Sequence, residues 1–96
     1  MTTRKLRVGV LGAGAWAHHA HIPGWQRDPR CEVVTICDVE RTRAEEAARK
    51  FGVSEATHDW QATVARSDLD VIDIATPSHT HHELAVAALE AGKHVL

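Results

Sequence analysis

Short apolar runs and amphipathic segments alternate along this 96-residue chain, and each kind predicts a different element. The apolar runs predict strands at Leu6–Leu11, Glu32–Cys37, within Val53–His58 at a sheet edge, at Val71–Ala75 and at Lys93–Leu96. Helical spacing predicts helices from Ala15, around Ala44–Phe51, at Trp60–Arg66 and at His79–Ala91. Because strand and helix alternate and parallel crossovers are right-handed, we expect one α/β domain over residues 1–96 with a doubly wound parallel sheet.

Start and stop signals bound three of these helices. Gly52 follows the second helix as its C′ residue, and Asp59 stands where it can cap the third. Pro23-Gly24 is expected to kink or break the first helix.

Composition narrows the classes of partner and the compartment. A formal charge of −2, with Arg and Lys scattered, argues against nucleic acid. No apolar stretch reaches the ~18–20 residues of a membrane helix, and residues 1–10 lack the features of a signal peptide. Cys31 and Cys37 fall on one strand, roughly 20 Å apart, too far for a disulfide. Two free thiols predict a cytoplasmic location.

The first strand runs into a glycine-rich turn. Residues 12–17, GAGAWA, fit the pattern G-x-G-x-x-G/A. Gly12 allows the tight turn, Gly14 lets a pyrophosphate approach the backbone, and a small residue at position 17 lets helix and strand pack. The positive end of the helix that follows favours phosphate. The turn therefore predicts a dinucleotide site, the alternative being glycines that serve only the turn.

Asp38 supports the dinucleotide and bears on its identity. It ends the second strand 24 residues after Gly14, close to the ~20 expected for the acidic residue that bonds the adenine ribose. Its alternative roles are a helix N-cap or a loop carboxylate. A carboxylate repels a 2′-phosphate, which favours NAD. Arg41 and Arg43 follow closely and are expected to be exposed helix charges, but they leave NADP possible.

Six histidines form two groups, after the glycine turn and after the fourth strand. They are His18, His19 and His21, and then His79, His81 and His82. In a doubly wound sheet both groups are expected near the crevice where ligands bind, and a spacing of three in each group puts a pair on one helix face, as in a metal site. No acidic or thiol ligand accompanies them at metal-like spacing. We therefore expect surface histidines, or histidines that line a nucleotide pocket, and no metal.

Three stretches together resemble one family. Val8–Pro23, Asp38 and above all Ile74–Leu96, which reads IATPSHTHHELAVAALEAGKHVL, are similar to the N-terminal domain of the glucose–fructose oxidoreductase / inositol dehydrogenase (Gfo/Idh/MocA) family. The family pattern runs T-P-x-x-x-H, then a helix of small residues ending A-G-K-H-V, then E-K-P. The resemblance covers essentially the whole chain.

The resemblance implies a Rossmann-like sheet with strand order 3-2-1-4-5, cut short here in its fifth strand. It implies an NAD(P)-dependent oxidoreductase that transfers a hydride between nicotinamide and a sugar, polyol or related hydroxyl compound. In it, backbone groups after the glycine turn meet the pyrophosphate, and the Thr-Pro loop lies near the nicotinamide. The implied cofactor-binding residues are Gly12, Gly14, Ala15, Trp16, Asp38, Thr76, Pro77 and His81.

The E-K-P motif, whose lysine assists proton transfer in the family, would begin just beyond Leu96. No catalytic residue is therefore expected in residues 1–96, and Lys93 is expected to be a solvated charge. We expect this chain to be the cofactor-binding part of such an enzyme, inactive alone, with the substrate domain and the homo-oligomer contacts elsewhere in the parent enzyme. Two alternatives stay open: a stand-alone nucleotide-binding module without catalysis, and a metal-binding protein that uses the histidines.

Overall fold

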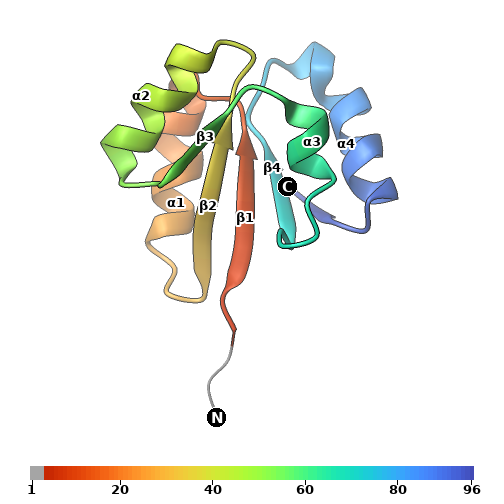
Figure 1. The fold of residues 1–96 in the computed structure, drawn as a ribbon, viewed down its shortest axis with the longest axis horizontal. Coiled ribbons are helices and arrows are strands. Elements are labelled where there is room, and N and C mark those ends of the chain that lie inside the picture. Colours follow the sequence, from red (N-terminus) through yellow and green to blue (C-terminus); the bar gives the residue numbers. More distant parts are fainter. Residues whose placement is uncertain (1–3) are drawn as a thin grey trace.

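The computed structural model describes residues 4–96, and within them five parallel strands form one sheet in the order β3-β2-β1-β4-β5 (Figure 1). The strands are β1 (Leu6–Leu11), β2 (Cys31–Cys37), β3 (Glu55–Thr57), β4 (Val71–Ile74) and β5 (His94–Val95). The helical elements are η1 (Ala17–His21), α1 (Ile22–Gln26), α2 (Arg41–Phe51), α3 (Trp60–Val64), η2 (Ser78–Thr80) and α4 (His81–Glu90). The order of strands confirms the doubly wound topology predicted from the sequence.

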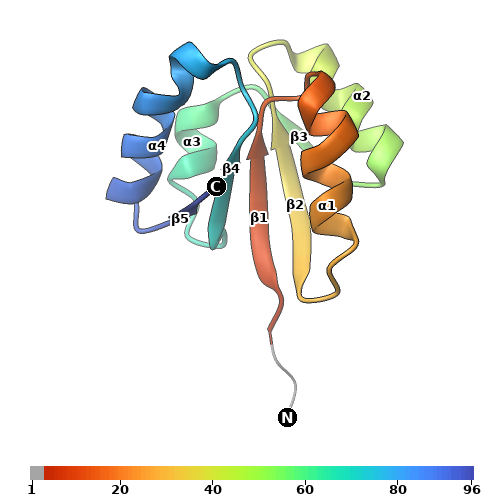
Figure 2. The ribbon, with the colours of Figure 1, turned by 180° about the vertical axis from the view of Figure 1, so that it is seen from behind.

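Helices cover both faces of the sheet. One core, with Val8 and Val10 of β1, packs under α1 and α2, and the other, with Ile72 of β4, packs under α3 and α4. Figure 1 shows α3 and α4 together on the flank of β4, and Figure 2 shows α1 beside β2 from the opposite side. Along β4, alternate side chains therefore point to different cores, and Asp73 points to the α1 side between Ile72 and Ile74.

Two helix boundaries predicted from local signals are confirmed. Gly52 has φ 70° and donates its N–H to the carbonyl of Ala48, which ends α2 in the left-handed conformation that glycine adopts at low cost. The carboxylate of Asp59 accepts the N–H of Ala62 at 3.1 Å and caps α3. No helix within residues 4–96 has the length and apolar character needed to cross a membrane.

Several element ends differ by a few residues from those predicted. The second strand begins one residue earlier, at Cys31, and α3 ends at Val64 because the N–H of Arg66 bonds the carbonyl of Thr63 in a tighter turn. The last helix, α4, begins at His81 because the N–H of Thr80 bonds Pro77, which makes residues 78–80 a 3₁₀ turn. These differences leave the strand order unchanged.

The prediction that Pro23-Gly24 kinks or breaks the first helix is wrong as to a break. Residues 15–26 are continuously helical, and the wide π turn of η1 lies directly before the proline. In that turn Ile22 donates its N–H to the carbonyl of Ala17, five residues back. Pro23 then occupies the first turn of α1, where its missing N–H is tolerated, so the helix continues to Gln26.

Candidate functional site

The glycine turn lies where β1 meets the ends of β2 and β4. Gly12 has φ +107° and donates its N–H to the carbonyl of Cys37 at 2.7 Å. A Cβ at Gly12 would lie 2.8 Å from the backbone carbonyl group of Ala75, so no larger residue fits without backbone movement. A Cβ at Gly14 would meet nothing within 4 Å. Gly12 is thus required by the fold, whereas the space beside Gly14 is open to a ligand.

Asp38 ties the end of β2 to this turn. Its Oδ2 accepts the N–H of Ala13 at 2.9 Å, and its Oδ1 accepts the N–H of Glu40 at 2.9 Å. The N-cap of α2 is Glu40, so Asp38 is not the helix cap. A carboxylate has about four lone-pair positions, so each oxygen of Asp38 still has capacity for a ribose hydroxyl.

The loop after β4 is held by the residues that follow it. The Thr80 hydroxyl lies 2.7 Å from both the Thr76 hydroxyl and the carbonyl of Pro77. His81 Nε2 donates to the carbonyl of Thr76 at 2.6 Å. His81 therefore supports the Thr76–Pro77 loop, and Thr80, which the sequence analysis did not single out, shares that role.

These elements enclose one cavity of about 530 Å³. Seven of the eight predicted cofactor-binding residues line it: Gly12, Gly14, Ala15, Trp16, Asp38, Thr76 and Pro77. The eighth, His81, is not among the lining residues. Lining residues not predicted as cofactor contacts include Val39, Trp60, His79 and Glu83. Trp16 and Val39 expose 74% and 81% of their surface, so two large apolar side chains are available to a ligand at the mouth of the cavity.

The two arginines after Asp38 differ in position. Arg43 lines the cavity, and its Nε lies 3.3 Å from the carboxylate of Glu40. Arg41 turns away and lies 2.7 Å from His58 Nδ1. Only Arg43 of these two therefore stands where it meets a group bound beside Asp38.

The expectation that both histidine groups lie at the same crevice is wrong. His79 lines the cavity, but the ring of His18 packs edge-on against Phe51, with 5.4 Å between centroids. His21 faces Asp73 on the other side of the same helix. The wide turn of η1 separates His18 from His21 although their spacing of three predicts one face. Within residues 4–96, no three His, Cys, Asp or Glu side chains gather as a metal site requires.

A buried polar cluster on β4 was missed. Asp73 is fully buried, and its carboxylate accepts from Trp25 Nε1 at 2.7 Å and lies 2.8 and 2.9 Å from His21 Nδ1. The signal was available in the sequence, because an acidic residue interrupts the apolar run Val71–Ala75. A carboxylate on a strand buried on both faces needs donors from the helix that covers it.

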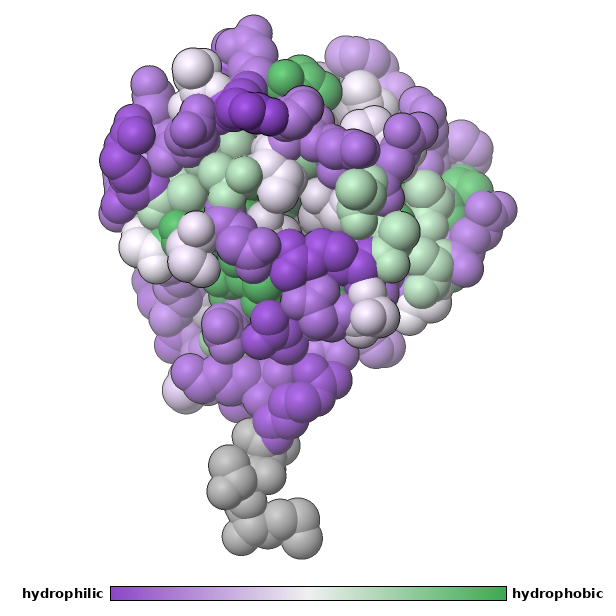
Figure 3. Space-filling model, viewed as in Figure 1, coloured by the Kyte–Doolittle hydropathy of each residue, from purple (hydrophilic) through white to green (hydrophobic). Residues whose placement is uncertain are grey.

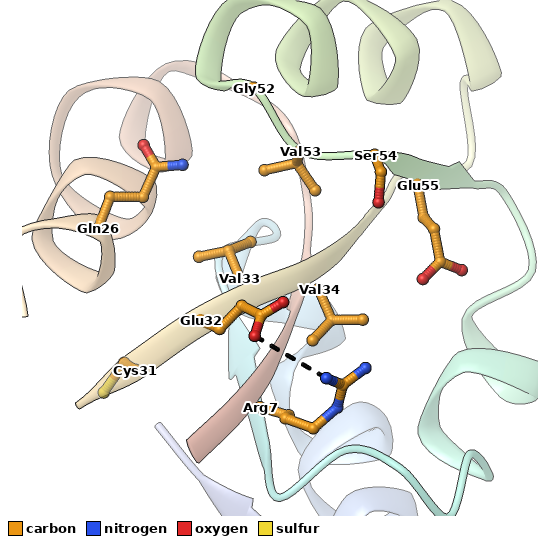
Figure 4. A pocket seen from close by; sticks show the side chains of 10 residues that line it. All are labelled: Arg7, Gln26, Cys31, Glu32, Val33, Val34, Gly52, Val53, Ser54 and Glu55. Atoms are coloured by element: carbon orange, nitrogen blue, oxygen red, sulfur yellow. Dashed lines mark ion pairs between the residues drawn. The ribbon is translucent and has the colours of Figure 1, made fainter. Parts of the chain in front are cut away.

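A second cavity, of about 400 Å³, lies beside β2 near the other end of the sheet (Figure 4). Arg7 and Glu32 face one another across its floor, with 3.9 Å between the guanidinium and the carboxylate. None of the predicted site residues lines it. The cavity at the glycine turn is therefore the one that joins the predicted residues.

The face shown in Figure 3 is mostly hydrophilic, with less polar surface gathered in a band across its middle.

Comparison with known proteins agrees with this geometry. A family model described as an oxidoreductase family with an NAD-binding Rossmann fold matches residues 6–96. Levoglucosan dehydrogenase from Pseudarthrobacter phenanthrenivorans is 39% identical over 100 residues, covering 97% of this chain and 26% of that protein. D-glucoside 3-dehydrogenase from Escherichia coli is 34% identical, covering 100% of this chain and 27% of that protein. The chain thus spans about a quarter of the length of these relatives.

Solved structures with the same fold include cofactor complexes. A 3-ketoreductase from Actinomadura kijaniata, in complex with NADP and TDP-benzene, matches with a TM-score of 0.90 at 33% identity, over 97% of this chain and 28% of that one. Levoglucosan dehydrogenase in complex with NADH and L-sorbose matches with a TM-score of 0.85 at 37% identity, over 97% and 27%.

Proposed function

We propose that this chain, which belongs to the Gfo/Idh/MocA oxidoreductase family with its NAD-binding Rossmann fold, binds a nicotinamide adenine dinucleotide in the cavity beside the glycine turn. The observation that carries the proposal is the convergence of three segments, from the ends of β1, β2 and β4, on that single cavity. Ligands of doubly wound sheets bind at this place, beyond the carboxyl ends of the strands where the strand order reverses.

The residues present fit the dinucleotide. The open space beside Gly14 admits a pyrophosphate, and the first N–H groups of a helix have no partners within the helix. Asp38 accepts the ribose hydroxyls, and Trp16 and Val39 offer apolar surface. In this proposal the Thr76–Pro77 loop, held by Thr80 and His81, borders the nicotinamide end.

NAD is the preferred cofactor in this proposal. The Asp38 carboxylate repels a 2′-phosphate, and Arg43, which lines the same cavity, is already close to Glu40. NADP stays possible because Arg43 carries the opposite charge to that phosphate. The solved relatives include complexes with each of the two cofactors.

The reaction that we propose for the parent enzyme follows from the names of the relatives, which are dehydrogenases of sugars and sugar derivatives. When bound, the nicotinamide would supply a hydride acceptor for a carbon that bears a hydroxyl, whose proton would go to a base as the carbonyl forms. Residues 1–96 contain no E-K-P sequence. Their part is to bind and orient the cofactor, so we propose that they do not catalyse the transfer alone.

The proposal extends to the location and the partners of the parent enzyme. We propose a cytoplasmic protein, because Cys31 and Cys37 are both free thiols. We propose that it forms homo-oligomers through parts that lie outside residues 1–96, and that its partners are the dinucleotide and a small-molecule substrate, with neither nucleic acid nor a membrane.

The test is a titration of the purified protein with NADH and with NADPH. Binding is followed by energy transfer from tryptophan to the reduced nicotinamide, since Trp16 and Trp60 line the cavity. We expect Asp38→Ala to weaken NADH binding about tenfold or more, the size of a lost hydrogen bond to a charged group. NADPH binding should weaken less, because the repulsion of its 2′-phosphate is lost together with the hydrogen bonds.

The matched control is Glu45→Ala, which removes an exposed carboxylate of α2 that does not line the cavity. NADH affinity should be unchanged in it. A folded wild-type protein that binds neither dinucleotide would refute the proposal. Binding without hydride transfer between the nicotinamide and any sugar or polyol, in a protein that continues past Leu96 into E-K-P, would instead favour a nucleotide-binding module.

A further inference from the structure

The wide turn in the first helix brings two core residues onto one face. Ala17 and Ile22 are both fully buried in the same core. In an uninterrupted α-helix they would lie about 140° apart around the axis, at ~100° per residue. Because Ile22 bonds the carbonyl five residues back, it takes the place that normally belongs to the residue four along, about 40° from Ala17. Such turns are rare and frequently mark functional sites.

Asp73 is the long-range partner of this turn. Its fully buried carboxylate lies 2.8 Å from Nδ1 of His21, the last residue of η1, and accepts from Trp25 one turn further along. A carboxylate accepts hydrogen bonds only, so the Nδ1 atom of His21 carries the proton that faces it. A buried carboxylate is costly without such donors, so the helix and Asp73 hold each other in one arrangement.

The part of the helix beyond the turn is fixed in the core, and the part before it faces the cavity. Ile22 and Trp25 pack in the core under the sheet, whereas Ala15 and Trp16 line the cavity. If the wide turn relaxed to α geometry, the two parts would rotate by about 100° relative to each other. The N–H of His18 donates to the carbonyl of Gly14, which ties the segment before the turn to the turn itself. This segment would then be displaced from the cavity.

We infer that Asp73 is a positioning residue for the dinucleotide: through His21 and Trp25 it holds the wide turn, and the turn sets the backbone of Gly14–Trp16 that meets the pyrophosphate. The inference rests on the proposed function, because it assumes that a dinucleotide occupies the cavity. Asp73 itself does not line that cavity, so it acts on the cofactor through the helix and not by contact.

Two substitutions at Asp73 separate positioning from simple stability. Asp73→Val keeps a similar shape on a β-strand and removes both bonds. In Asp73→Asn the amide oxygen still accepts from Trp25, and the amide N–H donates to His21 once the ring proton moves to Nε2. We expect Asp73→Val to raise the Kd for NADH about tenfold, measured on folded protein. Asp73→Asn should restore it to within about threefold of wild type.

Two histidines of η1 supply a second test at partly exposed or exposed side chains, in which one variant is the matched control of the other. His21→Ala removes the bond to Asp73 from a side chain that is 30% exposed, and we expect a rise in Kd of similar size. His19→Ala, an exposed histidine of the same turn, should leave the Kd unchanged. Amide hydrogen exchange over residues 18–22 should accelerate in Asp73→Val and His21→Ala but not in His19→Ala.

The outcomes distinguish the inference from the proposed function. If folded wild-type protein binds neither NADH nor NADPH, the proposed function is refuted, and the inference is refuted with it. Wild-type binding together with unchanged Kd in folded Asp73→Val ends the inference alone. If Asp73→Val does not fold, His21→Ala decides: an unchanged Kd, or a change equal to that of His19→Ala, overturns the inference.

Discussion

Replacing Gly12 by alanine tests the glycine turn at its tightest point. The added Cβ would lie 2.8 Å from the carbonyl carbon and oxygen of Ala75 and 2.9 Å from the nitrogen of Thr76. These are backbone atoms at the end of β4, and they cannot turn aside as the tip of a side chain can. The substitution also forces alanine to adopt φ +107°.

Both effects destabilise the folded state. A residue held in a sparsely populated region of backbone space costs about 1–3 kcal/mol, and overpacking a close contact costs about 1–3 kcal/mol. Their sum, about 2–6 kcal/mol, is a large share of the ~5–15 kcal/mol by which proteins of this kind are stable. For a domain of this length we therefore expect Tm to fall by more than about 10 °C.

Gly14→Ala is the matched control. A Cβ there meets nothing within 4 Å and the residue has no positive φ, so stability should change by less than about 0.5 kcal/mol. The same Cβ would occupy the space proposed for the pyrophosphate, and we expect NADH affinity to fall about tenfold or more. We therefore expect one glycine to serve the fold and the other to serve the ligand.

The assay combines urea unfolding with NADH titration on both variants. A Gly12→Ala protein as stable as wild type would refute this reasoning, because the backbone at Ala75 and Thr76 would then have moved away at no cost in stability. A Gly14→Ala protein with wild-type affinity would show that the pyrophosphate does not pass beside this glycine.

Three further predictions concern residues that are not proposed to contact the cofactor. Asp59→Ala removes the cap of α3 and should cost about 1 kcal/mol in urea unfolding. The Arg66 guanidinium, 2.7 Å from Asp68, holds the pKa of that carboxyl well below 3.8. The ion pair therefore stabilises the fold above about pH 4, and this stabilisation is lost as the pH falls. In Asp68→Asn the free energy of unfolding should depend less on pH below about pH 4. Burial raises the pKa of the Cys37 thiol, so a thiol reagent at neutral pH should label Cys31 first and Cys37 only with unfolding, as mass spectrometry of the labelled peptides would show.

The strand order and most of the cavity were predictable because they depend on signals local in the sequence. Gly12 and Asp38 each stand at the end of an apolar run, and parallel strands bring such ends to one edge of the sheet. Chain connectivity and handedness then place these residues together without any knowledge of side-chain contacts. The role of His81 was only partly predictable, because its bond to Thr76 stabilises the loop from outside the cavity.

Side-chain contributions across the cavity were harder to predict. Trp60 reads as the first residue of a helix and Val39 as a loop residue, and no periodicity indicates that both lie at the cavity beside the glycine turn. They come there because α3 begins and β2 ends at the same edge of the sheet. Their positions are thus a consequence of topology, which a local pattern does not contain.

The first helix shows why the histidines were placed wrongly. A spacing of three puts His18 and His21 on one face only if every residue between them follows α geometry. The wide turn breaks that condition, and its partner, Asp73, lies 52 residues away from His21 on another strand. The same long-range contact that defeats the periodic reading is the one from which we infer a role in cofactor binding. Periodicity assumes a regular helix, so departures from it are most informative where a buried polar residue elsewhere in the chain supplies a reason for the irregular turn.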